Sequence, residues 1–207
     1  MSASDPIFAT RTTTKLLDAL REASNEPIWT QFDARYRPVI AGLARRLGLD
    51  ATDADDVAQQ TLAEFVKAYR DGRYDRTKGR LSSWILGIAR HTSLGALRAR
   101  RRPGAGGGPD IEDNADIVEE SELRSIWDQE RDREILMRAL GTLRGESASD
   151  PKNLQAFELT ALRGMPAAQV ASQCSMSVEQ VYVAKSRMTK RLRGIVEQMT
   201  AAFEEDV

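Results

Sequence analysis

The sequence has little of the chemistry on which most enzymes and secreted domains depend. Its 207 residues include one cysteine, Cys174, and one histidine, His91. A disulfide within the chain is therefore excluded, and so is a metal cluster built from cysteine and histidine. No catalytic triad, metal site or phosphate-binding loop can be recognised, so we predict a protein that is not an enzyme and needs no metal or cofactor.

Long apolar runs are also missing. No segment approaches the roughly 20 consecutive apolar residues that a membrane-spanning helix needs. Residues 1–14 are polar and lack the apolar core of a signal peptide. We therefore expect a cytoplasmic protein that has no membrane partner.

The net charge is close to zero, but the charges are unevenly distributed. The formal net charge is -1, from 30 basic and 31 acidic residues. Residues 75–102 contain eight Lys or Arg and one acid, whereas residues 103–150 contain five Lys or Arg and thirteen acids. Such asymmetry indicates a nucleic-acid surface next to an acidic connector.

Apolar residues recur at helical spacing, without an alternating strand pattern and without an internal repeat. In the first block the spacing predicts one helix that ends at Gly48 and a second that ends near Gly72. Thr52 or Asp53 is the expected cap of the second helix. A third helix is expected over residues 81–101. Its apolar stripe includes Trp84, which we expect to be a core residue.

A segment rich in glycine and proline separates this block from a second helical block. Residues 103–109 combine proline with the high backbone entropy of glycine, so they cannot continue a helix. We interpret residues 103–117 as a flexible linker. The predicted fold class is all-α, with two small helical domains joined by this linker.

The second block has the layout of a helix-turn-helix. Helices are expected over residues 117–143, 154–162, 166–174 and 178–203. Ser177 and Gln180 form the S-x-x-Q capping box that starts the last helix. Its inner face would carry Val181, Ala184, Met188 and Leu192. The opposite face mixes cations with hydrogen-bonding groups, as a major-groove reader requires: Glu179, Tyr182, Val183, Ser186, Arg187 and Lys190. A plain amphipathic hairpin with a solvated face explains the same pattern.

A basic loop precedes the third helix and surrounds an aromatic residue. Tyr74 lies among Arg73, Arg76, Lys78 and Arg80. Cations beside an aromatic ring can hold phosphates and stack an unpaired base. Arg90 and His91 share a surface of the third helix, although His91 is equally well explained as an ordinary surface histidine. Residues 100–102 are better explained as a solvated helix end.

Three stretches, in one order, resemble the signatures of extracytoplasmic-function (ECF) sigma factors of the sigma-70 family. Asp53–Leu62 and Gly79–His91 resemble two segments of sigma region 2. Leu162–Ala171, with Ser177–Val181 and Ser186–Arg187, resembles sigma region 4. The resemblance covers about residues 28–199. Three motifs in the same order are much more specific than any one of them.

The resemblance implies a division of the chain and a role for each part. Residues 1–27 would be an N-terminal extension, 28–102 region 2, 103–117 the linker, 118–200 region 4 and 201–207 an acidic tail. Docking on core RNA polymerase is implied for Asp55, Asp56, Gln59 and Gln60. Contacts with the melted minus-10 promoter element are implied for Tyr74, Arg76, Lys78, Arg80, Arg90 and His91. Reading of the minus-35 element is implied for Glu179, Gln180, Tyr182, Val183, Ser186, Arg187 and Lys190.

Two positions depart from the family pattern. The family usually has Asn where His91 stands, and an acid where Gln60 stands. Loss of that acid should weaken charge pairing with a basic surface of the polymerase. Phosphorylation of the neighbouring Thr61 would add roughly -1.5 to -2 charges and restore it. The expected partners are therefore core RNA polymerase, promoter DNA and either a Ser/Thr protein kinase or an anti-sigma factor.

Two other classes of protein explain part of the sequence. A helix-turn-helix transcriptional regulator that does not bind core polymerase accounts for the second block. It leaves the motif over residues 53–62 and the basic loop unexplained. A helical interaction protein without a DNA role accounts for the apolar pattern alone. Binding to core polymerase separates a sigma factor from both.

Overall fold

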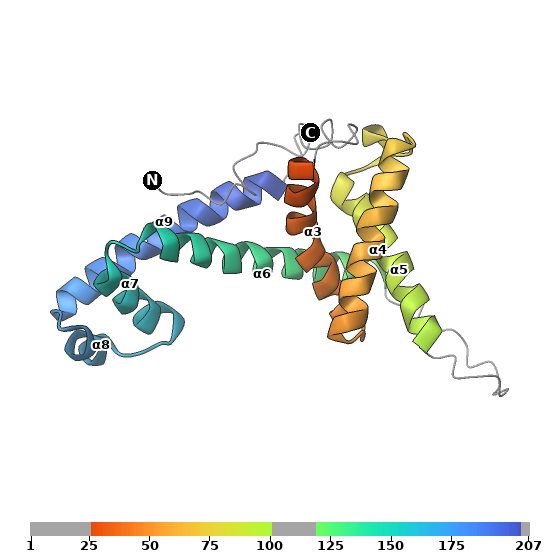
Figure 1. Cartoon of the computed structure of the whole chain (residues 1–207). Coiled ribbons are helices and arrows are strands. Elements are labelled where there is room, and N and C mark those ends of the chain that lie inside the picture. The colour runs from red at the N-terminus through yellow and green to blue at the C-terminus, as the bar shows by residue number, and fades with distance from the viewer. Residues whose placement is uncertain (1–25, 101–118, 204–207) are drawn as a thin grey trace. The chain divides into compact units, whose positions relative to one another are not determined.

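The computed structural model describes residues 26–100 and 119–203. All regular structure in these two ranges is helical, which confirms the all-α prediction. The chain divides into two compact units (Figure 1). We call residues 26–100 with 119–134 the N-terminal unit, and Ile135–Phe203 the C-terminal unit. The predicted linker, the acidic residues 204–206 and the predicted extension up to residue 25 lie outside the described residues.

Three helices form the body of the N-terminal unit. They are α3 (Glu26–Arg46), α4 (Ala51–Arg70) and α5 (Leu81–Arg100), and each packs against the other two. The predicted end of the first helix at Gly48 is confirmed. Gly48 has a φ of +103°, and the amide of Leu49 bonds to the carbonyl of Ala44 at 3.2 Å. A residue with a side chain would be strained in this left-handed turn, which ends α3 and leads directly into α4.

The cap of α4 differs from the prediction. The N-cap residue is Asp50, whose carboxylate accepts a hydrogen bond from the backbone N–H of Asp53 at 3.0 Å. Thr52 and Asp53 already lie inside the first turn of α4. The backbone of Asp50 is extended (ψ 177°), which is the conformation that an N-cap requires. Because the helix begins before both predicted caps, neither of them caps it.

Stacked aromatic rings fill the centre of the N-terminal unit. The Phe32 ring of α3 stacks on Phe65 of α4 at 4.7 Å between centroids. Trp84 of α5 meets Phe65 edge-on at 5.3 Å, and Tyr69 stacks on Phe65 at 5.9 Å. Phe65 is completely buried. Offset and edge-on pairs of this kind stabilise a core beyond the area that they bury, so Phe65 ties α4 to both of its neighbours.

Helix α6 (Glu120–Glu146) contributes its first part to the N-terminal unit. Arg46 donates to the Gln129 side chain at 3.1 Å, and Arg124 donates to Ser83 at 3.3 Å. Glu130 packs over Gly42, where a Cβ atom would collide with its carboxylate. The boundary between the two units therefore follows residue 134, whereas the boundary predicted from the sequence lies in the linker, residues 103–117. The functional domains drawn from the sequence remain a prediction.

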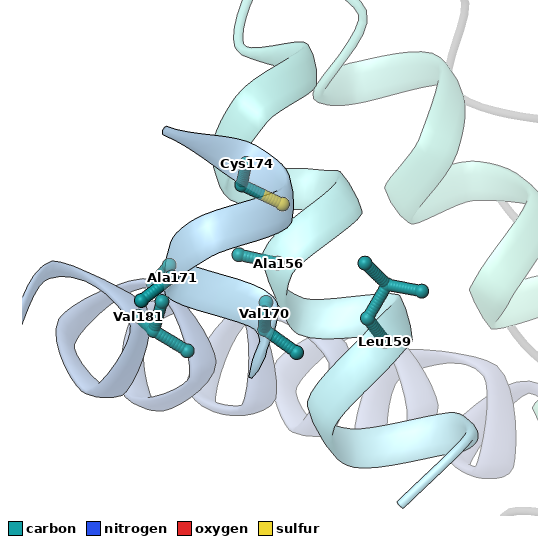
Figure 2. Packing of buried hydrophobic residues seen from close by; sticks show 7 residues of the cluster. Ala156, Leu159, Val170, Ala171, Cys174 and Val181 are labelled. Atoms are coloured by element: carbon teal, nitrogen blue, oxygen red, sulfur yellow. The ribbon is translucent and has the colours of Figure 1, made fainter. Parts of the chain in front are cut away.

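The C-terminal unit continues from Ile135 and contains α7 (Pro151–Phe157), η3 (Glu158–Leu162), α8 (Ala167–Cys174) and α9 (Val178–Phe203). Segment η3 is a π-helical turn that continues α7. Figure 2 shows how side chains from these elements converge on a buried apolar cluster that includes Cys174. Ser175, with a φ of +52°, makes the tight turn after α8. The predicted order of helix, turn and longer helix is confirmed.

No helix among the described residues is long and apolar enough to cross a membrane. A search of the same residues finds no group of three or more His, Cys, Asp or Glu side chains placed to hold a metal ion.

Candidate polymerase and nucleic-acid interfaces

The four residues expected to dock on polymerase share an exposed face of α4. Asp55, Asp56, Gln59 and Gln60 are all exposed. The buried face of the same helix packs on α3 and α5 and includes Ala54, Val57 and Ala58. Gln60 donates to Glu64, one turn later, at 2.9 Å. Helical periodicity thus separates a core face from a polar face with a carboxylate at Asp55 and another at Asp56.

Thr61 does not lie on this face, contrary to the expectation from the sequence. Its exposed fraction is 0 %. Its hydroxyl forms a buried hydrogen bond of 2.7 Å with the hydroxyl of Thr92 on α5. Thr92 is also within 3.1 Å of two backbone carbonyls of its own helix. One residue advances a helix by about 100°, and this turns Thr61 from the surface beside Gln60 into the contact between α4 and α5.

A cation that the sequence reasoning missed lies near the docking face. Arg37 of α3 is bound by Asp33, one turn earlier, with contacts between 2.6 and 3.1 Å. The hydrogen bond to Asp33 raises the pKa of Arg37, burial opposes this, and the charges of Asp33 and Asp55 raise it further. The carboxylate of Asp55 therefore faces a partly compensating charge. The spacing of Asp33 and Arg37 along one helix was the available signal.

The basic loop is ordered by its own acid. Asp75 accepts hydrogen bonds from the backbone N–H of Thr77 at 3.0 Å and from its hydroxyl at 2.7 Å. The ammonium of Lys78 lies 3.6 Å from the same carboxylate. These hydrogen bonds, that of the Thr77 hydroxyl first, lower the pKa of Asp75. Asp75 thus closes a short turn that leads into η1 (Arg76–Lys78).

Tyr74 is seated on the aromatic core. Its ring stacks on Trp84 at 5.1 Å with 16° between the planes, and it is half-buried. Trp84 is also half-buried, so it contacts Phe65 on the core side and Tyr74 on the loop side. Lys78 and Arg80 are exposed on the same loop. The side chain of Arg76 lies outside the described residues.

Helix α5 presents His91 to solvent, while Arg90 is half-buried. Its last residue, Arg100, is exposed, as expected for a solvated helix end, but it also forms ion pairs that the sequence did not predict. The Arg100 guanidinium lies 3.2 Å from the carboxylates of both Asp50 and Asp53. It therefore joins the end of α5 to the start of α4. The expected cations Arg101 and Arg102 lie outside the described residues.

The capping box of the helix-turn-helix is confirmed in both directions. The backbone N–H of Ser177 donates to the Gln180 side chain at 2.8 Å, and the N–H of Gln180 donates to the Ser177 hydroxyl at 3.2 Å. Val181, Ala184 and Met188 are buried, and Leu192 is half-buried. The expected reading face is exposed throughout: Glu179, Gln180, Tyr182, Val183, Ser186, Arg187 and Lys190.

Glu179 is held ionised at the start of this face. A hydrogen bond from its own backbone N–H, then one from the Ser177 hydroxyl, lowers the pKa of Glu179. The sequence reasoning missed three neighbours on the same helix. Lys185, Thr189 and Arg193 line a hollow of about 570 Å³, together with Tyr182, Ser186 and Lys190.

Comparison with known proteins supports most directly the interpretation of residues in the N-terminal unit as sigma region 2. The family model described as Sigma-70 region 2 matches residues 32–103. A relative described as the ECF RNA polymerase sigma factor RpoE, from Cereibacter sphaeroides, is 29% identical over 109 residues. The matched part is 50% of this chain and 59% of the relative. The family match ends at residue 103, so the interpretation of α8 and α9 rests on their own geometry.

Proposed function

We propose that this chain acts as an ECF-type sigma factor, and the match of residues 32–103 to the Sigma-70 region 2 family model supports this proposal. Such a protein is a non-enzymatic subunit that directs core RNA polymerase to promoter DNA. The observation that carries the proposal is the exposed polar face of α4, which includes Asp55 and Asp56 and lies within the matched region. A basic loop and a helix-turn-helix with a cationic face follow it in the chain.

The proposed roles follow the two units. Asp55, Asp56, Gln59 and Gln60 dock on core polymerase. Cations and rings on the loop and on α5 contact the minus-10 element: Tyr74, Arg76, Lys78, Arg80, Arg90 and His91. The exposed face of α9 reads the minus-35 element with Glu179, Gln180, Tyr182, Val183, Ser186, Arg187 and Lys190. Arginine suits guanine in the major groove, and glutamine suits adenine.

Affinity capture of core polymerase tests the docking face. Charge reversal by Asp56→Arg should reduce capture at least tenfold, because a carboxylate facing a basic surface becomes a repelling cation. Glu197→Arg is the matched control, since Glu197 is exposed on α9, a helix of the C-terminal unit. Promoter-dependent run-off transcription with core enzyme completes the test. A chain that neither binds core polymerase nor supports run-off, with or without prior phosphorylation, would refute the proposed function.

A DNA-binding regulator that does not use polymerase is the second candidate. The exposed face of α9 favours it as much as it favours a sigma factor. The two candidates differ in the use of α4. Specific binding to duplex DNA by a chain that fails to capture core polymerase would support the regulator.

We also propose that docking is limited by the missing charge at Gln60. The Gln60 side chain is exposed, so Gln60→Glu adds a carboxylate to the docking face without disturbing the core. Tighter capture of core polymerase is expected, by roughly a few-fold, as one more partly screened ion pair can supply. Gln198→Glu, an exposed position on α9, is the control. Equal capture by the wild type and Gln60→Glu would refute the charge deficit.

Phosphorylation of Thr61 remains a proposal, now with a structural requirement. Because Thr61 is completely buried and bonded to Thr92, a kinase can reach its hydroxyl only when the contact between α4 and α5 opens. A phosphate would then hold the side chain outside the core, since burial of an unpaired dianion is prohibitively costly. Mapping of the phosphate after treatment with a Ser/Thr kinase tests the site. Control by an anti-sigma protein is the alternative, and co-purification of such a protein would reveal it.

A further inference from the structure

We propose that one flank of α9, formed by Lys185, Thr189 and Arg193, binds the sugar–phosphate backbone of DNA beside the face that reads the bases. The proposal rests on the DNA-binding role of α9 given above and extends it to three residues outside the reading face. Its partner is a strand of duplex DNA, recognised through its phosphates rather than through its sequence.

The flank is a defined surface feature. Lys185, Thr189 and Arg193 line a hollow of about 570 Å³ with Tyr182, Ser186 and Lys190. Three of the six lining residues are cations, one is a tyrosine and two carry hydroxyls; none is acidic. Ammonium, guanidinium and hydroxyl groups are the side-chain donors that proteins direct at phosphate oxygens. Because none of the six lining residues is acidic, the hollow suits an anionic group better than a cationic one.

Helical geometry aligns the three residues. They are spaced four residues apart, so they form a row about 12 Å long along the helix. A duplex places one phosphate per 3.4 Å along each strand, so the row can meet more than one phosphate of the same strand. Tyr182, Ser186 and Lys190 lie between this row and the rest of the reading face. A helix seated with that face toward the bases would direct the row at one wall of the groove.

The charges of the flank are available for binding. Within the described residues, Lys185, Lys190 and Arg193 form no ion pair, whereas Arg191 on the same helix binds Glu146 at 2.8 Å. Lys185 and Arg193 are both exposed. A cation without a protein partner can bind a phosphate at no cost from a lost ion pair, because no intramolecular pair must be broken first. Arg191 therefore offers a matched control that differs mainly in being paired.

The test measures how salt affects promoter binding by the complex of the full-length chain with core polymerase. Lys185→Gln and Arg193→Gln should each lower the slope of log K against log salt by about 0.9, the value for one phosphate contact. The loss of affinity should be equal on a duplex with the target minus-35 element and on one with that element scrambled. Arg191→Gln should leave the slope unchanged.

Arg187→Gln serves as the contrast, because Arg187 lies on the proposed reading face. It should reduce the preference for the target duplex over the scrambled one. If Lys185→Gln and Arg193→Gln leave the slope at the wild-type value while Arg187→Gln still relaxes the preference, the flank proposal is overturned and the sigma-factor function stands. A loss confined to the target duplex would also overturn it, because the residues would then read bases. Failure of the wild type to bind polymerase would instead refute the proposed function.

Discussion

Thr61 is the residue whose position in the structure differs most from the expectation from the sequence. The resemblance directed attention to Thr61 as the neighbour of Gln60. The helical pattern of the same segment contained the opposite signal, since Thr61 lies four residues after Val57 and four before Phe65. Both of those residues are buried, and so is Thr61. A residue between two core positions on one helical face is expected in the core whatever its chemistry.

Replacement of Thr61 tests this placement through stability. Thr61→Val keeps the shape but removes the hydrogen bond to Thr92, which still has backbone carbonyls within reach. The free energy of unfolding should therefore fall by about 1 kcal/mol. Thr61→Glu should cost several kcal/mol, because it forces an unpaired carboxylate into the core. Urea denaturation measures both, with the exposed substitution Gln60→Glu as the control. A Thr61→Glu variant as stable as the wild type would contradict the buried position.

Asp75 makes the loop before α5 sensitive to acid. The hydrogen bonds from Thr77 lower the pKa of Asp75 in the folded loop. A carboxyl with a lowered folded pKa contributes order that is fully present above its unfolded pKa of about 3.9 and is lost as the pH falls through the folded value. We therefore expect the amide resonance of Thr77 to be constant from pH 8 to 5 and to move only below about pH 4. Asp75→Asn, which keeps one acceptor, should abolish this titration. A midpoint near pH 6 would contradict the assignment.

At the scale of elements, the sequence predicted features that depend on residues close together in the chain, such as helix caps and helix ends. The capping box of α9 depends on two residues three apart, and both of its hydrogen bonds are present. The glycine that ends α3 was read in the same way. The cap of α4 was misplaced because three acids and a threonine crowd its start. The extended backbone of Asp50 and the hydrogen bond that its carboxylate accepts from the Asp53 N–H distinguish the true cap from its neighbours.

Contacts between elements were not predictable from these rules. The Arg100 bridge to Asp50 and Asp53 joins residues that are about 50 positions apart in sequence. The packing of Glu130 over Gly42 likewise depends on how α6 meets α3. Leu136 of α6 follows the buried Ile135 in the chain, yet it is 45 % exposed. Periodicity gives the orientation of a helix only approximately, and the residues at the edge of a stripe depend on the neighbours that pack there.

The capping box should make a measurable contribution to the stability of the C-terminal unit. Ser177→Ala removes the acceptor for the N–H of Gln180 and should cost about 1 kcal/mol. Ser186→Ala is the matched control, because Ser186 is exposed inside the same helix and alanine is the better helix former. Far-UV circular dichroism during thermal unfolding compares the two variants. Equal midpoints for Ser177→Ala and Ser186→Ala would show that the cap contributes nothing.

At the scale of the whole chain, each unit has its own spectroscopic signature. The three tryptophans, Trp29, Trp84 and Trp127, all belong to the N-terminal unit. The C-terminal unit is built around a cluster of alanine, valine, leucine and cysteine side chains. Tryptophan fluorescence therefore follows unfolding of the N-terminal unit alone, whereas circular dichroism follows the helices of both.

Two variants use this difference to ask whether the units unfold separately. Thr61→Val weakens the N-terminal unit, so the fluorescence midpoint should fall by roughly 4–8 °C for a loss of about 1 kcal/mol. Ser177→Ala weakens the C-terminal unit, so part of the circular dichroism transition should move while the fluorescence midpoint is unchanged. Because the buried hydrogen bond and the capping box lie in different units, each substitution should act on one transition. If Ser177→Ala shifts both probes by the same amount, the chain unfolds as one cooperative body. In that case α4, which we propose docks on polymerase, and α9, which we propose reads DNA, would unfold together. A substitution that destabilises one of these helices would then also reduce the stability of the other.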